Sequence, residues 1–109
     1  MTPRQFEIWK CKPEGFSKAH WFVIISGNER CAEPRQVAVN GLACYTLRGP
    51  AGKLDVLLNS ADGFTASTAC QCDYFFPLPK SGLHDKIGAV SLERQQQIKA
   101  RIREILRLN

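Results

Sequence analysis

Hydrophobic and polar positions follow strand-like patterns over the first ninety residues. His20–Ser26 is almost continuously apolar and rich in β-branched and aromatic residues, which predicts a strand buried on both faces. Phe6–Trp9 alternates weakly and predicts an earlier strand. Arg35–Leu47 predicts a longer extended stretch, and Leu54–Asn59 a short strand. Thr68–Phe76 alternates clearly, which predicts a strand with two distinct faces.

Turn-forming residues separate these segments. Ser26–Asn28 and Ser60–Gly63 are turn clusters, and Arg48–Gly52 contains a proline and two glycines that cannot continue a central strand. Asn40-Gly41 predicts a bulge or a tight bend within the third extended stretch. Pro77 and Pro79 are expected to end the strand Thr68–Phe76. Short strands spaced in this way favour a small barrel over a flat sheet, which would leave its edges open.

The last segment changes period and predicts a helix. Ser91 is a suitable N-cap, and Glu93 in the first turn suits the positive end of the helix dipole. An apolar stripe recurs at helical spacing, and a basic stripe lies on the opposite side: Ile98, Ile102 and Ile105, against Lys99, Arg103 and Arg107. The basic stripe is expected to be a solvated face. The chain is therefore predicted to be one mainly β domain, residues 1–109, with a C-terminal α-helix.

Composition supports a globular protein. Hydrophobic residues make up 44% of the 109 residues and charged residues 23%, which excludes a disordered chain. The longest apolar run, Trp21–Ile25, is far shorter than the roughly 20 residues of a membrane span. No apolar segment that resembles a signal peptide follows Met1–Gln5. We expect a soluble, cytoplasmic protein that does not associate with a membrane.

The cysteines indicate neither a disulfide framework nor a metal site. Their number is odd and their spacing irregular: Cys11, Cys31, Cys44, Cys70 and Cys72. Free, mostly buried thiols are expected, because free cysteine behaves as a small hydrophobic residue. Cys70 and Cys72 are one residue closer than the pairs of zinc sites, and no second half-site is nearby. We expect no metal and no cofactor.

Several short strings resemble the PemK/MazF family of toxin–antitoxin systems. Leu83–Ser91 is similar to the family's leucine, basic–isoleucine–glycine and hydrophobic–serine run before its terminal helix. Gly63-Phe64 and Ser67–Phe76 look like the family's glycine-led loop and the following strand with its acidic residue, here Asp73. Arg4–Trp9 resembles the family's start more loosely, without the glycine and with one residue more.

The resemblance implies an SH3-like barrel of five to seven strands with a C-terminal α-helix, paired as a homodimer. It also implies a metal-independent endoribonuclease that cuts single-stranded RNA and is neutralised by a cognate antitoxin. The chemistry of the family is attack of a 2′-hydroxyl on the adjacent phosphate. Such a reaction needs a proton acceptor, a proton donor and positive charge or hydrogen-bond donors at the phosphate.

Two residues stand at the catalytic positions of the family, and one of them matches it. Its threonine at the end of the third strand corresponds to Thr46, and its arginine before the second strand is replaced by His20, with Trp21 where the family has proline. An imidazole with a pKa near 6.5 accepts a proton from a 2′-hydroxyl, although it cannot hold a permanent charge. The alternative interpretation is a solvated histidine at a strand end and a threonine chosen for its strand propensity.

Three further residues are candidates for substrate binding. Lys18 precedes His20 by two positions, and Arg48 follows Thr46 by two, so both are placed to hold phosphate. Asp73 is predicted on the polar face of its strand, where it would orient His20 or Arg48. Each of the three is otherwise a solvated surface residue. The net charge of +5 is compatible with a polyanionic partner.

Two other functions fit the same fold. The first is a binding module without catalysis, in which Trp21 fills a contact surface for RNA or protein. The second is a gyrase poison resembling CcdB, a branch that depends on a tryptophan-containing C-terminus. The last residues, Leu106–Asn109, contain no tryptophan, so this function ranks behind the others. His84 is expected in a solvated loop ahead of the helix.

Overall fold

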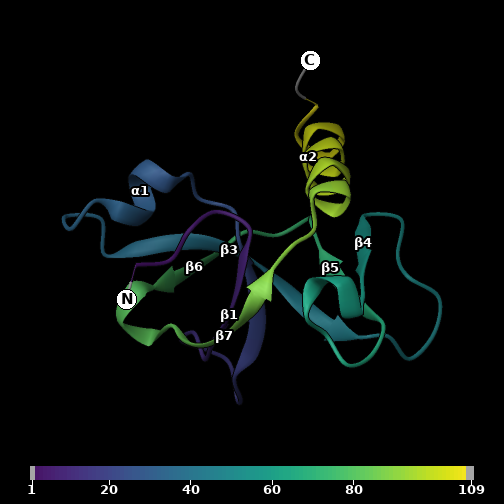
Figure 1. The fold of residues 1–109 in the computed structure, drawn as a ribbon, viewed down its shortest axis with the longest axis horizontal. Coiled ribbons are helices and arrows are strands. Elements are labelled where there is room, and N and C mark those ends of the chain that lie inside the picture. Colours follow the sequence, from purple (N-terminus) through teal and green to yellow (C-terminus); the bar gives the residue numbers. More distant parts are fainter. Residues whose placement is uncertain (1, 108–109) are drawn as a thin grey trace.

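The computed structural model describes residues 2–107, which form a mainly β fold with a C-terminal helix (Figure 1). The predicted fold class is confirmed. In chain order the elements are β1 (Glu7–Cys11), β2 (His20–Ile24), α1 (Asn28–Ala32), β3 (Ala38–Thr46), β4 (Asp55–Leu58), β5 (Thr68–Gln71), β6 (Phe76–Pro79), β7 (His84–Ala89) and α2 (Leu92–Leu106). Leu108 and Asn109, which belong to the C-terminal residues considered for the gyrase-poison alternative, lie outside the described residues.

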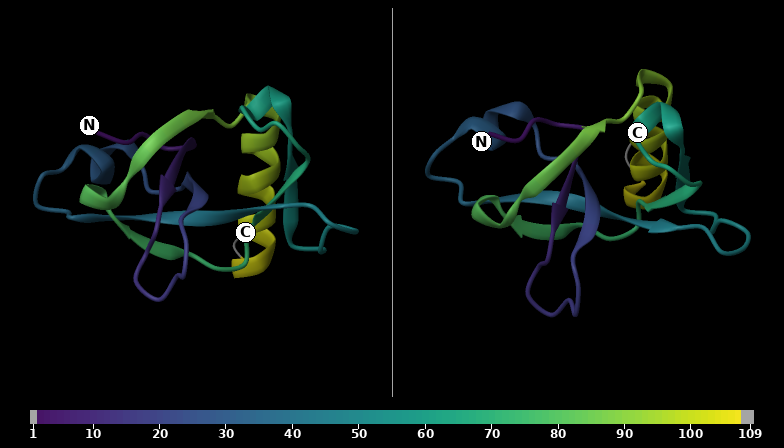
Figure 2. Two further views of the ribbon diagram at one scale, coloured as in Figure 1. Left: turned by 90° about the horizontal axis from the view of Figure 1, so that it is seen from below. Right: turned by 60° about the horizontal axis from the view of Figure 1, so that its bottom comes forward.

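Within residues 2–107, seven strands form one antiparallel sheet in the order β4-β5-β3-β2-β1-β7, and β6 pairs with β3. The long strand β3 connects the two ends of this sheet. Its first half pairs with β6 and its last three residues pair with β5, while its other edge pairs with β2. In Figure 2, β3 runs across the molecule, with α1 near its start and α2 beside β4 and β5.

Each face of the sheet covers its own hydrophobic core. The α2 core contains Val23, Leu42, Cys44 and Ile98, with Ile102 and Ile105 packed against it. The α1 core contains Phe22, Ile24, Val39, Ala43 and Cys31. Because successive side chains of β2 enter different cores, the prediction that this strand is buried on both faces is confirmed over Phe22–Ile24.

The predicted helix is α2. Ile98 is fully buried, and Ile102 and Ile105 are partly buried beside it, whereas Lys99 and Arg103 are exposed. The N-terminus of the helix differs from the prediction, because the Ser91 side chain makes no capping hydrogen bond. Instead the backbone N–H of Ser91 donates to the carboxylate of buried Asp62, at 2.8 Å.

The predicted strand Thr68–Phe76 is wrong as a single element. It divides into β5 and β6 around the connection 72–75, and β6 includes Pro77 and Pro79, which were expected to end a strand. Proline is tolerated there because β6 pairs with β3 on one edge only, so its other edge needs no amide donors. Asp73 consequently lies in a connection and not on a strand face.

Three further expectations are corrected. The backbone of β3 continues through Asn40-Gly41 without a bulge or bend. Gly41 is required there by close packing, since a Cβ at this position would lie 2.5 Å from Leu78 Cδ1. The turn after Ser26 leads into α1, a helix that the pattern did not predict. His84 begins β7 instead of lying in a loop, and β7 pairs with β1.

The cysteines agree with the prediction: all five are free and buried. Among residues 2–107, no group of three or more histidine, cysteine or acidic side chains is arranged to hold a metal ion. Within the same residues, no helix has the length and apolar character needed to cross a membrane.

Candidate active site

A cleft of about 310 Å³ lies where β2 begins and β3 ends. Antiparallel pairing brings these two strand ends together, because Trp21 is the partner of Cys44. Four of the five residues predicted for the site line this cleft: Lys18, His20, Thr46 and Arg48. The remaining lining residues are Lys10, Ala19, Trp21, Cys44 and Tyr45. Segments about 25 residues apart in sequence therefore meet at one surface.

His20 and Thr46 reach the cleft from different faces of the sheet. The register places Tyr45 across from His20, and the centroids of their rings lie 5.0 Å apart. Both belong to the α1 side of the sheet, together with Phe22 and Ala43. Thr46 continues the other side, that of Trp21 and Cys44, with which it also lines a smaller adjoining pocket.

The imidazole of His20 contacts two aromatic rings. Phe16, from the connection between β1 and β2, meets it edge to face with 5.3 Å between ring centroids. Tyr45 contacts it from β3. Burial lowers the pKa of His20, and the nearby Lys18 lowers it further. His20 is therefore neutral at pH 7 and presents a nitrogen lone pair that can accept a proton.

Three cations line the same cleft as this imidazole. Lys10 comes from β1, and its Nζ lies 5.5 Å from the centre of the Trp21 ring. Lys18 and Arg48 are exposed and also line the cleft. No carboxylate belongs to the lining that the described residues form. A phosphate diester in the cleft would be attracted by all three side chains and repelled by none.

Thr46 and Arg48 are held by the pairing of β3 with β5. Thr46 is the partner of Thr68, and the pairing extends one step further because the Leu47 N–H donates to the carbonyl oxygen of Ser67, at 3.0 Å. The Thr46 side chain is exposed, so its hydroxyl is available to a ligand. A hydroxyl donates one hydrogen bond, which suits a non-bridging phosphate oxygen.

One predicted role is not supported by these positions. Asp73 is exposed in the 72–75 connection and does not line the cleft, so the expectation that it orients His20 or Arg48 is withdrawn. Trp21, which the alternative of a binding module places at a contact surface, is half-buried. It packs against the α2 core, lies beneath Lys10 and lines the cleft, so that alternative stays open.

Lys10, Phe16 and Tyr45 were not among the predicted site residues. Tyr45 is detectable in sequence only once His20–Ser26 is paired with the residues before Thr46, because a register must be known before the partner of His20 can be named. Lys10 lies on the same side of β1 as Trp21, its partner on β2. Phe16 lies in an irregular connection, where no periodic pattern applies.

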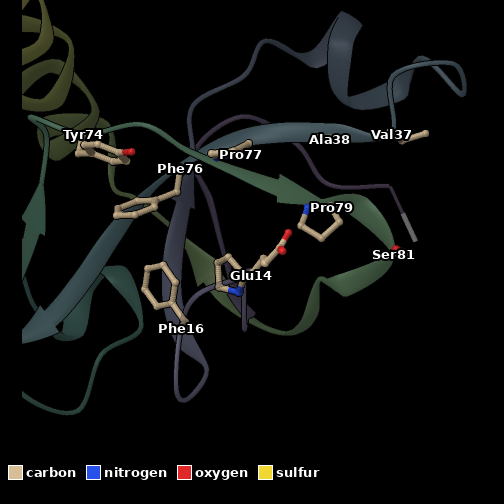
Figure 3. A pocket seen from close by; sticks show the side chains of 10 residues that line it. Glu14, Phe16, Val37, Ala38, Tyr74, Phe76, Pro77, Pro79 and Ser81 are labelled. Carbon is tan, nitrogen blue, oxygen red and sulfur yellow. The ribbon is translucent and has the colours of Figure 1, made fainter.

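A larger, mostly apolar groove of about 730 Å³ adjoins the site (Figure 3). Figure 3 shows Phe16 next to Phe76 in the lining of this groove, and their ring centroids are 5.2 Å apart. Pro77, Pro79 and Tyr74 form the wall contributed by β6 and the segment before it. Phe16 therefore touches both His20 and the groove.

Comparison with known proteins gives matches among solved structures only. No family model matches the chain, and no curated protein matches it. An endoribonuclease in complex with its cognate antitoxin, from a mycobacterial species, superimposes with a TM-score of 0.82 at 22% identity, covering 98% of this chain and 97% of that one. The chain has the fold of the MazF toxins. The sequence resemblance is confirmed at this level.

Two further MazF structures agree. The Mycobacterium tuberculosis toxin MazF-mt6 has a TM-score of 0.77 at 19% identity, over 94% of this chain and 98% of that chain. The MazE–MazF structure from Deinococcus radiodurans has a TM-score of 0.80 at 9% identity, over 100% and 99%. At these identities the likeness concerns the MazF fold, which includes β7 and α2, the elements formed by Leu83–Ser91 and the residues that follow it.

Proposed function

We propose that the chain is a toxin-like endoribonuclease that cleaves single-stranded RNA by attack of a 2′-hydroxyl on the adjacent phosphate, without a metal. One observation carries the proposal: a neutral histidine, His20, shares a cleft with the cations Lys10, Lys18 and Arg48. General-base chemistry and phosphate binding are thereby combined at one surface.

His20 acts as the proton acceptor. As its nitrogen takes the proton of the 2′-hydroxyl, the 2′-oxygen forms a bond to phosphorus and the bond from phosphorus to the 5′-oxygen breaks. The products are a 2′,3′-cyclic phosphate and a fragment with a 5′-hydroxyl, whose proton returns from the imidazolium or from water. A lowered pKa favours this direction, because the free imidazole is the resting form.

Cations and a hydroxyl stabilise the phosphate as negative charge builds up on it. Arg48 presents a planar guanidinium that matches two phosphate oxygens, and Lys18 supplies a compact charge beside His20. The Thr46 hydroxyl donates a hydrogen bond to one of the non-bridging phosphate oxygens. These side chains take over the charge that the family's arginine would have provided at the position of His20.

A cleavage assay with matched histidine variants tests the proposal. Purified protein is incubated with a labelled single-stranded RNA in the presence of a chelator. We expect discrete products from the wild type, and a rate about 10²–10⁴-fold lower from His20→Ala. His84→Ala is the control and should retain full activity, because His84 is exposed and outside the cleft. Intact RNA with the wild-type protein, or equal rates for the two variants, would contradict the proposal.

The same proposal includes a cognate antitoxin, a homodimer and action in the cytoplasm, where RNA is the target. One of the similar structures is described as an endoribonuclease in complex with its cognate antitoxin, and another as MazE–MazF, which supports the first element. A cleft with three cations and no lining carboxylate suits an acidic segment that competes with RNA. Mass measurement in solution tests the homodimer, and inhibition of cleavage by the product of the neighbouring gene tests the antitoxin.

A further inference from the structure

We infer that Phe16 and Tyr45 form a clamp that fixes the orientation of the His20 imidazole, and that Tyr45 is a positioning residue of the site. The clamp is defined as these two rings together with the imidazole that both of them contact. Its effect on cleavage rests on the proposed function, whereas its effect on the imidazole itself does not.

The two sides of the clamp come from different parts of the fold. Tyr45 belongs to β3, where its partner on β5 is Ala69, a small residue that leaves room above the sheet. Its ring is tilted by 56° to the imidazole. Phe16 approaches edge-on, at 72°, from the connection between β1 and β2. An imidazole in contact with two aromatic rings has lost much of its rotation about χ2.

Packing against other aromatic residues holds the Phe16 ring of the clamp in place. The Phe16 ring also packs edge to face against Phe22 and Phe76, with centroid separations of 5.8 and 5.2 Å. Phe22 is fully buried in the α1 core. The orientation of the imidazole is therefore set by the core through Phe16, and completed by Tyr45, whose ring is 36% exposed. An exposed aromatic ring placed against a histidine adds little to the core, which favours a role in the site.

The charged and titratable groups near His20 affect how readily its imidazole is protonated. Lys18 lies two residues before His20, Lys10 lies on β1, and Arg48 lies after β3. Cys11, the partner of His20 on β1, has a buried thiol. Lys18 disfavours a second positive charge on the imidazole, and the two rings cover part of its surface. Removing one ring lets water in while the lysines and the arginine remain.

A tyrosine series separates ring contact from hydroxyl chemistry. Tyr45→Phe keeps the ring, and Tyr45→Ala and Tyr45→Leu remove it, with Tyr74→Ala as a control at another exposed tyrosine that does not touch His20. NMR titration of the His20 imidazole is measured in each folded variant. We expect the pKa of His20 to rise toward 6.5 in Tyr45→Ala and Tyr45→Leu, and to stay at its wild-type value in Tyr45→Phe and Tyr74→Ala.

Kinetics provide the second readout. In Tyr45→Ala we expect kcat to fall on the order of 10–100-fold with KM nearly unchanged, since a loosened base is misplaced without loss of phosphate contacts. Tyr45→Phe should restore the wild-type rate. An equal loss in Tyr45→Phe would assign the role to the hydroxyl and overturn the clamp, as would an unchanged imidazole titration in Tyr45→Ala and Tyr45→Leu. If the titration shifts as expected but no variant cleaves RNA, the proposed function fails and the clamp stands.

Discussion

The imidazole of His20 lies against the phenol ring of Tyr45, with their centroids 5.0 Å apart. The contact follows from the antiparallel register of β2 and β3, in which Trp21 is the partner of Cys44. Sequence reasoning paired His20 with Thr46, which is one residue further along β3 and on the other face of the sheet. Thr46 and Tyr45 both line the cleft with His20, but the strand register is needed to show that Tyr45 is the residue in contact with the proposed base.

The lowered pKa of His20 predicts the acid limb of the pH–rate profile. As a general base, the imidazole is active only when it is unprotonated, so kcat/KM should fall as pH drops through the pKa of the free protein. Because burial and Lys18 lower this pKa, the midpoint of the limb should lie below 6.5. The profile is measured from about pH 4.5 to 8 on one RNA substrate. A midpoint clearly above 6.5 would show that the base is another group or that His20 is not in the described environment.

The cations of the cleft predict the salt dependence of RNA binding. Lys18→Gln and Arg48→Gln should each weaken binding of a non-cleavable single-stranded RNA. Each should also reduce the slope of log K against log salt by about 0.7, the contribution of one phosphate contact. Lys99→Gln is the control. Lys99 is an exposed residue of α2 that lies above the Phe6 ring and does not line the cleft. Equal slopes in all four proteins would remove both side chains from the phosphate site.

Gly41 predicts a stability effect that is independent of catalysis. Gly41→Ala places a methyl group 2.5 Å from Leu78 Cδ1 and 3.2 Å from Phe22 Cβ, so it should lower the free energy of unfolding by about 1–3 kcal/mol. Gly49→Ala, which meets no atom within 4 Å, should change it by less than about 0.5 kcal/mol. Urea unfolding measures both. An unaffected Gly41→Ala protein would mean that β3 and β6 are not as close as described.

Asp62 predicts a second such effect. Its buried carboxylate accepts from the backbone N–H of Asn59 at 3.0 Å and from that of Ser91 at 2.8 Å, which joins the turn after β4 to the start of α2. Asp62→Ala should cost about 1–3 kcal/mol, because two donors lose their acceptor. The matched variant Asp73→Ala should leave both stability and RNA affinity unchanged, since Asp73 is exposed outside the cleft. Thermal unfolding and the binding assay distinguish these outcomes.

Local patterns predicted those elements whose burial follows a regular period. β2 is buried on both faces, and α2 has one apolar stripe, so both are visible in the sequence. β7 was missed because its side chains are exposed or half-buried, which leaves no alternation to detect. The division of Thr68–Phe76 into β5 and β6 was not predicted. Pro77 and Pro79 were expected to end a strand, but both belong to β6, an edge strand in which proline is tolerated.

The site was predictable only in part, for a related reason. His20 and Thr46 were proposed through the family resemblance, and Lys18 and Arg48 through their spacing to them. Lys10, Phe16 and Tyr45 come to the cleft through tertiary packing that no local pattern encodes. Asp73 was assigned a strand face because its neighbours alternate, but the chain leaves the sheet at this point.

Analysis of the cleaved ends, with a substrate that carries a single 2′-deoxynucleotide, tests the central claim most directly. The account predicts 2′,3′-cyclic phosphate and 5′-hydroxyl ends, formed in the presence of a chelator, and no cleavage at the nucleotide that lacks its 2′-hydroxyl. Cleavage at the deoxynucleotide, 5′-phosphate ends or full inhibition by the chelator would contradict it.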